Sequence, residues 1–318
     1  VFADLLANNP VIELAPMAGV TNRAFRRVCR EASADIRRHA GQTDLDNTIY
    51  VAEMTTSQAL LYRNDETLKL ITFDDDESPR SIQLYGVDAD IVGRAVKLVV
   101  DEDRADHIDL NFGCPVPKVT RKGGGAALPF KRNLFREIVK AAVESAKPYG
   151  IPVTVKMRIG IDTDHHTYLE AAKSAADLGV AWVALHARTA QQMYEGKADW
   201  SAIKNLVEHL KPTGVPVLGN GDIWSGADGA EMVRQTGCAG VVVGRGCLGR
   251  PWLFADLVDA FNGGNNRVLP TLHEVSEVMY RHGELIVDYF ESEDRGCRDL
   301  RKHMAWYLKG FRVPSELR

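Results

Sequence analysis

One cysteine in this sequence, Cys114, stands where a thiol could take part in chemistry. It follows the apolar segment His107–Asn111 and is followed by Pro115 and a glycine-rich loop. Reacting groups are commonly held where a rigid strand becomes a loop. Pro115 restricts the backbone of the residue before it to extended angles, which fixes the direction of the thiol. We therefore treat Cys114 as a candidate reactive group, with simple core packing as the alternative.

Polar residues also recur at the ends of the other strand-like segments. Polar groups on otherwise apolar strands are costly to bury unless they are partnered. Singly, each could be a satisfied core group; together they predict one ligand-lined cavity. They are Pro16, Met17 and Ala18 after the first segment, Gln83 on the third, Asn111 on the fourth, Lys156 and Arg158 on the fifth, His186 on the sixth, Asn220, Gly221 and Asp222 at the seventh, and Gly244 and Arg245 after the eighth.

The loops after the last two segments suit an anion. Glycines such as Gly221 and Gly244 let backbone N–H groups approach a phosphate, and Arg245 can add a charge-assisted contact. Many barrels bind phosphate at this place. Gly244-x-Gly246-x-x-Gly249 also matches a dinucleotide pattern, but that pattern needs a following strand that ends in an acid. Here a polar loop and two helices follow, so we interpret the loops as a barrel phosphate site.

The elements that must position these residues alternate between apolar strands and amphipathic helices. Such alternation indicates a parallel sheet covered by helices, and eight units in this length favour an α/β fold of the (β/α)8 TIM-barrel class. The predicted strands are Val11–Ala15, Tyr50–Glu53, Ser81–Tyr85, His107–Asn111, Val153–Met157, Trp182–His186, Val215–Gly219 and Gly240–Val243. The predicted helices between them are Asn22–Ala32, Ile91–Val100, Leu134–Ala146, Tyr168–Leu178, Ala202–Leu210 and Ala227–Thr236.

The pattern changes after Phe261. The rest predicts two helices without strands, Leu272–Phe290 and Arg298–Phe311. We therefore divide the chain into a catalytic barrel, residues 1–261, and a small helical domain, residues 262–318. The sequence does not begin with Met, and we assume neither terminus to be the native one.

Composition sets the broad class. The 318 residues are 45% hydrophobic and 26% charged, as in ordinary soluble proteins, and neither a membrane-spanning run nor an export signal is expected. Five widely spaced cysteines without a CxxC pair predict neither a disulfide framework nor a metal site, and favour a reducing cytoplasm. The net charge of −4 gives no whole-molecule attraction to nucleic acid.

A phosphate site and a lysine on the fifth strand suit flavin mononucleotide (FMN). Lys156 is expected beside the N1/O2 edge of the flavin, where it would stabilise negative charge on the reduced ring. Gln83 is expected at the pyrimidine edge. The alternative for Lys156 is a buried ion pair.

Several motifs together resemble the bacterial tRNA-dihydrouridine synthases, with the overall character of their B-type branch. The resemblance covers nearly the whole chain, and the Asn-x-Gly-Cys-Pro-x-x-Lys motif is its most specific part. The motifs are Ala15–Thr21, Glu53-Met54, Gln83–Gly86, Asn111–Lys118, Lys156–Arg158, His186–Thr189, Gly219–Ile223, Gly244–Gly246 and His303–Gly310.

The resemblance implies an FMN barrel that reduces a uridine of tRNA to 5,6-dihydrouridine. NADPH would reduce the flavin, the flavin N5 would pass a hydride to C6 of the uracil, and Cys114 would give a proton to C5. An ordinary thiol is mostly protonated at neutral pH and can donate. Asn111 would hold the uracil. FMN would be held by Pro16, Met17, Ala18, Gln83, Lys156, His186, Asn220, Gly221, Asp222, Gly244 and Arg245.

The C-terminal segment supplies the local positive charge that tRNA would need. The expected tRNA contacts are Lys118, Arg121, Arg298, Arg301 and Lys302, supported by Lys122, Arg295, Lys309, Arg312 and Arg318, with Trp306, Tyr307 and Phe311 interleaved. A solvated helix face is the alternative. No obligate protein partner is evident.

One stretch departs from the family pattern. Ala34 to Tyr50 is more polar than the strand expected before Glu53, so the start of the second strand stays undefined. Two other functions remain open. One is an FMN barrel that acts on a free pyrimidine, of the dihydroorotate or dihydropyrimidine dehydrogenase type. The other is an RNA-binding module with a vestigial flavin site.

Overall fold

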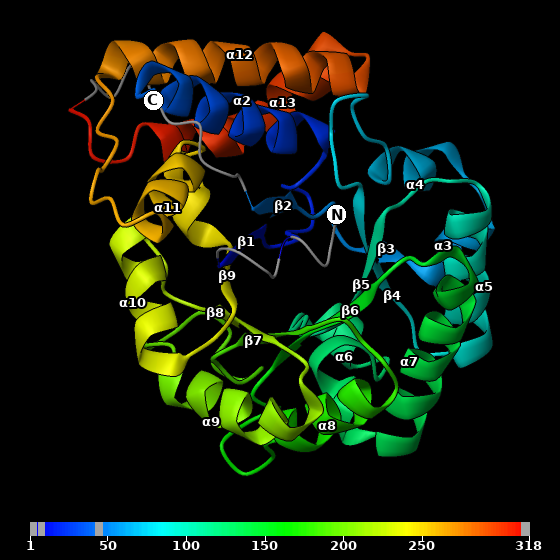
Figure 1. The fold of residues 1–318 in the computed structure, drawn as a ribbon. Helices are drawn as coiled ribbons and strands as arrows, with labels where there is room; N and C mark the ends of the chain where they lie inside the picture. The colour runs from blue at the N-terminus through cyan, green and yellow to red at the C-terminus, as the bar shows by residue number, and fades with distance from the viewer. Residues whose placement is uncertain (1–4, 6–9, 42–46, 313–318) are drawn as a thin grey trace.

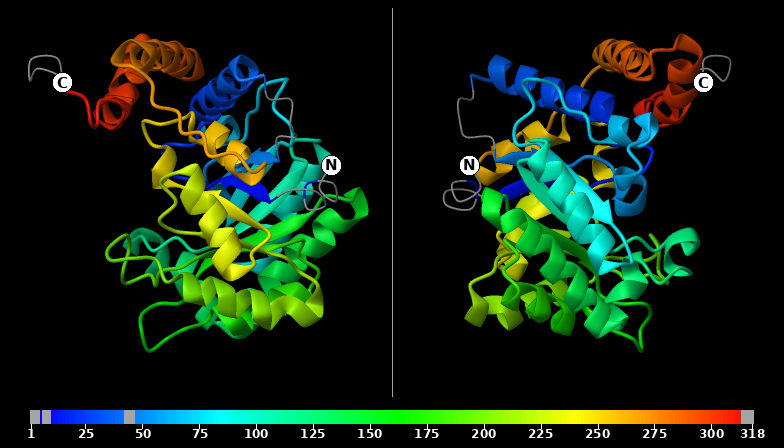
Figure 2. Two further views of the ribbon diagram at one scale, coloured as in Figure 1. Left: turned by 60° about the vertical axis from the view of Figure 1, so that its left-hand side comes forward. Right: turned by 90° about the vertical axis from the view of Figure 1, so that its right-hand side faces the viewer.

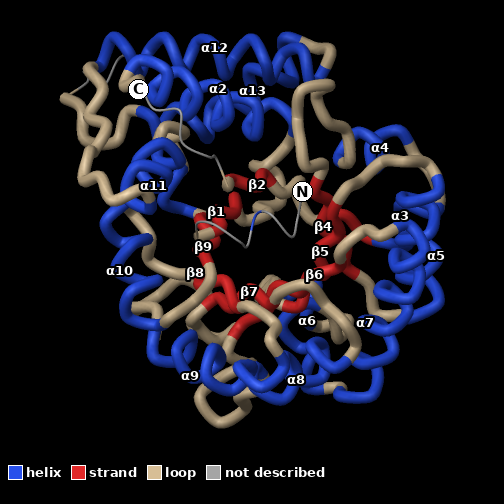
Figure 3. The backbone as a smooth tube through the Cα atoms, viewed as in Figure 1, coloured by secondary structure: helices blue, strands red, loops and turns tan. Residues whose placement is uncertain are grey.

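The computed structural model describes residue 5 and residues 10–41 and 47–312. Within these residues all strands are parallel to their neighbours and lie in one sheet, in the order β2-β1-β9-β8-β7-β6-β5-β4-β3. Figure 3 shows the strands as an inner ring surrounded by helices. The predicted TIM barrel is confirmed. The strands are β1 (Val11–Leu14), β2 (Thr48–Tyr50), β3 (Thr55–Thr56), β4 (Ser81–Tyr85), β5 (His107–Phe112), β6 (Val153–Arg158), β7 (Val183–His186), β8 (Val217–Asn220) and β9 (Gly240–Val243).

The second strand of the barrel is interrupted, and its two parts close the ring. β2 pairs with β1, Val51 forms a parallel bridge with Ser81 of β4, and β3 pairs with the end of β4. Between the two parts, the carboxylate of Glu53 accepts a hydrogen bond from the N–H of Gly19 at 2.6 Å. The predicted strand Tyr50–Glu53 is therefore wrong in its bounds, because it starts earlier and breaks where Glu53 turns to the loop after β1. The other predicted strands agree with the structure to within two residues at each end.

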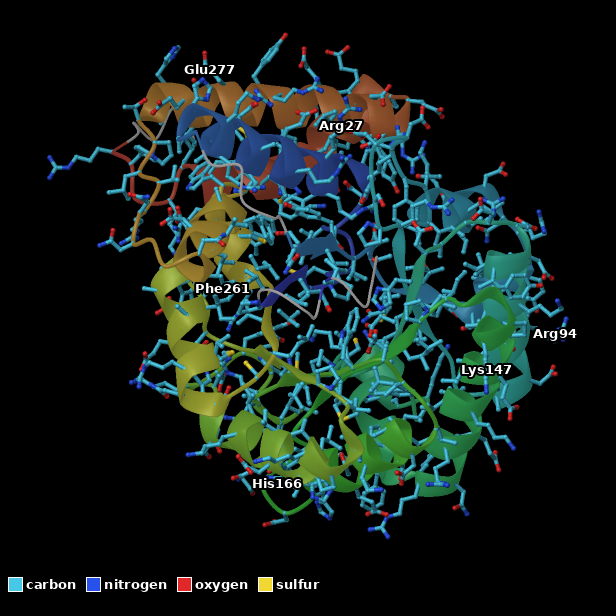
Figure 4. All side chains as sticks on the ribbon, in the orientation of Figure 1. Arg27, Arg94, Lys147, His166, Phe261 and Glu277 are labelled. Carbon is cyan, nitrogen blue, oxygen red and sulfur yellow. The ribbon has the colours of Figure 1, made fainter. Side chains whose placement is uncertain are left out.

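Helices follow the strands and cover the ring (Figure 1). Their outer faces carry charged side chains, such as Arg94, which Figure 4 shows at the edge of the molecule. The helices are α2 (Arg23–His39), α3 (Ser57–Leu61), α4 (Asp65–Leu70), α5 (Ala89–Asp101), α6 (Pro117–Thr120), α7 (Arg132–Ala146), α8 (Tyr168–Asp177), α9 (Trp200–Leu210), α10 (Gly226–Thr236) and α11 (Leu253–Phe261). Short 3₁₀ turns are η1 (Gly125–Phe130), η2 (Lys147–Tyr149), η3 (Lys211–Thr213) and η4 (Arg245–Cys247). None of the helices in the described ranges is long and apolar enough to cross a bilayer.

Helix α2 is longer than the predicted helix Asn22–Ala32. The side chain of Asn22 caps it by accepting a hydrogen bond from the N–H of Phe25 at 3.0 Å. The helix continues to His39 because Ile36 packs against a buried cluster that includes Trp252. The polar stretch left undefined by the sequence thus holds the end of α2 and the whole of β2, while residues 42–46 lie outside the described part.

Two helices follow the barrel. Helix α12 (Leu272–Phe290) has the predicted bounds, whereas α13 (Glu293–Tyr307) starts and ends earlier than the predicted Arg298–Phe311. Its start is fixed by Ser292, whose hydroxyl accepts a hydrogen bond from the N–H of Arg295 at 3.3 Å. This capping residue was not recognised in the sequence.

The helical pair packs against α2 at one side of the barrel, as both views of Figure 2 show. Phe25 of α2 meets the rings of His282 and His303, with centroid distances of 5.7 and 5.5 Å. The hydroxyl of Tyr307 lies 3.1 Å from Nδ1 of His282. Burial lowers the pKa of His282 to about 3 and that of His303 to about 2, so both rings are neutral at pH 7. They act here as packing groups.

Gly249 brings the backbone of the barrel against the backbone of α13. Its φ is +69°. A Cβ there would lie 2.2 Å from the carbonyl carbon of Trp306 and 2.6 Å from the backbone nitrogen of Tyr307. Backbone therefore meets backbone, and any side chain at this position must push the helix away.

Replacing Gly249 with Ala should destabilise the protein more than its backbone conformation alone explains. Gly214 is a matched control, since its φ is +73° and a Cβ there would meet no atom within 4 Å. We expect Gly214→Ala to cost about 1–2 kcal/mol of unfolding free energy. Gly249→Ala should cost roughly 1–3 kcal/mol more from overpacking, as measured by urea unfolding. Equal losses in the two variants would show that the contact with α13 is not tight.

Candidate active site

A cavity of about 380 Å³ opens at the carboxyl ends of the barrel strands. This is the end at which barrel enzymes hold their active sites. Among the described residues, every predicted cofactor residue except Gln83 lines it, together with Cys114 and Asn111. Its lining consists of Pro16, Met17, Ala18, Val20, Met54, Asn111, Gly113, Cys114, Pro115, Val116, Lys156, Arg158, His186, Tyr194, Asn220, Gly221, Asp222, Ile223, Trp224, Val242, Gly244, Arg245, Gly246, Leu248 and Trp306.

The half-buried Cys114 is held by the turn that follows β5. The side-chain oxygen of Asn111 accepts hydrogen bonds from the N–H groups of Gly113 and Cys114, at 3.1 and 2.9 Å. On the other side, the carbonyl of Cys114 accepts a hydrogen bond from the N–H of Ala126 at 3.0 Å. Gly125 has a φ of +54°, and a Cβ there would lie 2.4 Å from the oxygen of that carbonyl. The close approach of these two loop segments therefore requires glycine. The position of the thiol is thus set from both sides.

Gln83 lies beneath the cavity. It is fully buried, its amide donates to Asp109 at 2.6 Å, and its carbonyl oxygen accepts from the amide of Asn111 at 2.7 Å. The structure therefore places it behind Asn111, away from the cavity wall where the sequence predicted it.

A buried ion pair organises the loops after β7 and β8. Arg188, 1% exposed, donates to both carboxylate oxygens of Asp222 at 2.7 and 2.8 Å and to the carbonyl of Gly196 at 2.7 Å. Asp222 also accepts from the N–H of Ala198 at 2.7 Å. Burial alone would raise the pKa of Asp222, but this N–H and Arg188 outweigh it and lower the pKa. The carboxylate therefore belongs to the framework of the cavity.

Arg158, at the end of the neighbouring strand β6, performs a similar task. Its guanidinium group donates to the carbonyls of Gly113 at 3.0 Å and of Thr189 and Met193 at 2.8 Å each. Burial lowers its pKa to about 10, so it stays charged at neutral pH. It joins the turn of Cys114 to the loop after β7.

The cavity wall near these two arginines is electropositive. The ammonium group of Lys156 donates to Asn220 at 3.3 Å, and burial, together with the charge of Arg158, lowers the pKa of Lys156 to about 8. His186 is buried, and both burial and the nearby cations lower its pKa well below its usual value. It is neutral at pH 7, while Lys156, Arg158 and Arg245 supply positive charge.

Two buried carboxyl groups lie close enough to Lys156 to influence it. Burial, and next the charge of Asp109, raise the pKa of Glu13 to about 8, and burial raises that of Asp109 to about 6. Their attraction for the ammonium group opposes its loss of a proton. The lysine is therefore held between buried carboxyl groups below and cations at its side.

Two aromatic residues at the cavity were not predicted from the sequence. The guanidinium carbon of Arg245 lies 4.6 Å from the ring centre of Tyr194 and 5.5 Å from that of Trp224. Both rings are about half exposed, at 50% and 44%. Their only signal in the sequence is their place in the loops after the sixth and seventh predicted strands.

The predicted tRNA contacts do not line the cavity. Lys118 and Arg121 are exposed beside the Cys114 turn, and Arg298 and Arg301 are exposed on α13. Lys302 donates to the carbonyl of Gly19 at 2.5 Å and pairs with Asp299, so it ties α13 to the loop after β1. Arg318 lies outside the described residues. In the described part of the chain, no three His, Cys, Asp or Glu side chains are grouped to hold a metal ion.

Comparison with known proteins identifies the family. The model of the dihydrouridine synthase family matches residues 13–318. The chain belongs to this family. It is 54% identical to the probable tRNA-dihydrouridine synthases of Mycobacterium leprae, over 96% of this chain and 82% of that protein, and Mycobacterium tuberculosis H37Rv, over 98% and 77%. It is 35% identical to tRNA-dihydrouridine synthase B of Vibrio parahaemolyticus, over 98% and 90%. The resemblance found in the sequence motifs is confirmed.

Neutralising Asp222 should destabilise this dihydrouridine synthase family member by leaving the buried Arg188 without its counter-charge. We expect Asp222→Asn to lower the unfolding free energy by about 3 kcal/mol in urea titrations. The matched control is Asp294→Asn, because Asp294 pairs with Arg298 at 3.0 Å while both side chains are 67% exposed. That change should cost less than about 1 kcal/mol. Similar losses in both variants would contradict a structural role of the buried pair.

Proposed function

We propose that this chain is an FMN-dependent tRNA-dihydrouridine synthase, which reduces a uridine of tRNA to 5,6-dihydrouridine with NADPH as the electron donor. The observation that carries the proposal is one cavity that holds both a positioned thiol, Cys114, and a cationic wall at the phosphate end of a barrel. Membership of the dihydrouridine synthase family supports the same reaction.

The donor set of the cavity fits FMN. Among its described lining residues Asp222 carries the one carboxylate, and this is already paired with Arg188. Arg245 also lies 3.7 Å from Asp222, so one carboxylate faces two arginines, and the remaining positive charge, together with that of Lys156, calls for an anion such as the FMN phosphate. Gly221 would present its backbone there, because a Cβ at this position would lie 2.6 Å from that of Ala198. When bound, FMN would supply the hydride that goes to C6 of the uracil.

The chain's own residues would complete the reduction. Asn111 lines the cavity beside Cys114 and would hold the uracil, while the thiol would give its proton to C5. The thiolate that remains would regain a proton from solvent. Lys156, whose ammonium group lines the cavity, would favour negative charge on the reduced cofactor.

The division of labour follows the two parts of the chain. The barrel, up to residue 261, would hold the flavin, and the helical region from residue 262 would hold tRNA through Arg298 and Arg301, joined by Lys118 and Arg121 beside the thiol. Both parts of the chain contribute to the cavity, since Trp306 of α13 forms part of its wall. The free thiols of the described cysteines suit a reducing, cytoplasmic setting.

Cys114→Ala should keep the bound flavin and NADPH oxidation but lose uridine reduction, because only proton delivery is removed. We expect a loss of about 100-fold or more in dihydrouridine formed on unmodified tRNA. Cys297→Ser, which changes an exposed thiol outside the cavity lining, should behave as the unaltered protein. Oxidation of the reduced enzyme by free uracil, or reduction of the oxidised enzyme by dihydroorotate, without oxidation of the reduced enzyme by tRNA, would favour the free-pyrimidine alternative.

The double variant Arg298→Glu/Arg301→Glu should weaken tRNA binding without changing flavin reduction. Losing two phosphate contacts should raise the KM for tRNA about tenfold or more and lower the salt dependence of binding by about two charges. The matched control is Lys140→Glu/Lys147→Glu, which reverses two exposed charges on α7 and η2, outside the cavity lining and outside α13. Equal effects of the two double variants would argue against a specific tRNA surface on α13.

A further inference from the structure

A continuous set of hydrogen bonds runs inside the barrel from the Cys114 turn to Asp109. Asn111 accepts from the N–H groups of Gly113 and Cys114 and donates to Gln83 at 2.7 Å. Gln83 in turn donates to Oδ2 of Asp109 at 2.6 Å. Gln83 and Asp109 are also direct partners in the pairing of β4 with β5. Asp109 is 2% exposed, so water does not replace these bonds.

The direction of these bonds is fixed at the Cys114 end. Backbone N–H groups can only donate, so Asn111 must turn its oxygen toward them and its amide nitrogen toward Gln83. Gln83 must then present its oxygen to Asn111 and its nitrogen to Asp109. The chain therefore needs an acceptor at Asp109. Without one, a buried amide group is left unpaired or both amides turn over.

We propose that Asp109 is a positioning residue for Cys114, acting through Gln83 and Asn111. It keeps the side-chain oxygen of Asn111 against the two N–H groups of the turn, and so keeps the thiol in its place. This inference rests on the proposed function for its catalytic consequence, because there Cys114 donates the proton.

The second oxygen of Asp109 belongs to a second arm of hydrogen bonds, separate from the arm that runs through Gln83 and Asn111 to the Cys114 turn. It accepts from the hydroxyl of Thr154 at 2.7 Å, and this hydroxyl lies 2.8 Å from Nε2 of His107, whose Nδ1 lies 3.1 Å from the hydroxyl of Ser81. Hydroxyl groups and a neutral imidazole can each exchange donor and acceptor roles. This arm is therefore able to reverse, whereas the arm that leads to Cys114 is not.

The two arms predict different effects of two substitutions at one position. Asp109→Ala removes the acceptor, and reoxidation of the reduced, FMN-loaded enzyme by unmodified tRNA should slow by about 100-fold, the scale of a misplaced reacting group. Asp109→Asn retains one acceptor oxygen for Gln83, and the reversible arm can accept from its new N–H group. It should restore the rate to within about threefold of the unaltered enzyme. Both substitutions also remove the negative charge near Lys156, so any change in the reduction of the flavin by NADPH should be the same in the two variants.

Thr154→Val is the matched control, because it removes a hydrogen bond to the same carboxylate from the other arm at nearly constant volume. It should leave reoxidation by tRNA unchanged. Should Asp109→Ala give no soluble protein, Asp109→Leu keeps the branched shape of the side chain and takes its place. The proposal is overturned if Thr154→Val and the Asp109 variant without an acceptor slow reoxidation equally, or if neither does.

Amide hydrogen exchange separates this inference from the proposed function. In the FMN-loaded protein, exchange of the peptide that contains Gly113 and Cys114 should accelerate at least about tenfold in Asp109→Ala and stay unchanged in Asp109→Asn and Thr154→Val. If the unaltered enzyme is not reoxidised by tRNA, the proposed function is wrong. The exchange rates still decide whether Asp109 positions the turn, and unchanged exchange in Asp109→Ala would refute it.

Discussion

Two buried guanidinium groups hold the cavity together. Arg158 joins the Cys114 turn to the loop after β7, and Arg188 joins that loop to Asp222 after β8. A buried cation is tolerated only when its donors are satisfied, and here backbone carbonyls satisfy most of them. Because carbonyls carry no full charge, the charge of Arg158 is not balanced by its partners, whereas that of Arg188 is paired with Asp222. The interactions that shape the cavity therefore also make it electropositive.

The sequence revealed the barrel because buried strands stand out as apolar runs, and it revealed the site because polar residues interrupt those runs at their ends. It could not reveal how deep below the cavity an inward-pointing side chain lies. The two-residue periodicity of a strand tells whether a side chain points into the barrel. The tilt and stagger of the strands decide the position of that side chain along the barrel axis. Gln83 and Lys156 both point inward, yet only Lys156 reaches the cavity. Tyr194 and Trp224 were missed for another reason: loop conformation, which no periodicity reports, brings them to Arg245.

The interior of the barrel is divided into an apolar and a polar half. TIM barrels are usually filled with layers of branched apolar side chains. Here β7, β8 and β9 supply such a filling, with Ala184, Leu218 and Val242 in one buried cluster, whereas β1 contributes both Val11 to that cluster and the buried Glu13. By contrast, β4, β5 and β6 place hydrogen-bonded polar side chains inside, beneath the turn that carries Cys114. The sequence could be read for each strand separately, but this asymmetry appears only when the strands are set side by side.

The contact of Gly249 with the backbone of α13 also bears on how the molecule meets a large ligand. No layer of side chains separates barrel and helix there, so neither can slide or swivel on the other without parting. The distance from the exposed arginines of α13 to the thiol of Cys114 is consequently fixed by the packing of α13 against the barrel. A tRNA bound at both ends as proposed would have to conform to that distance, and the bending or opening needed would fall on the RNA.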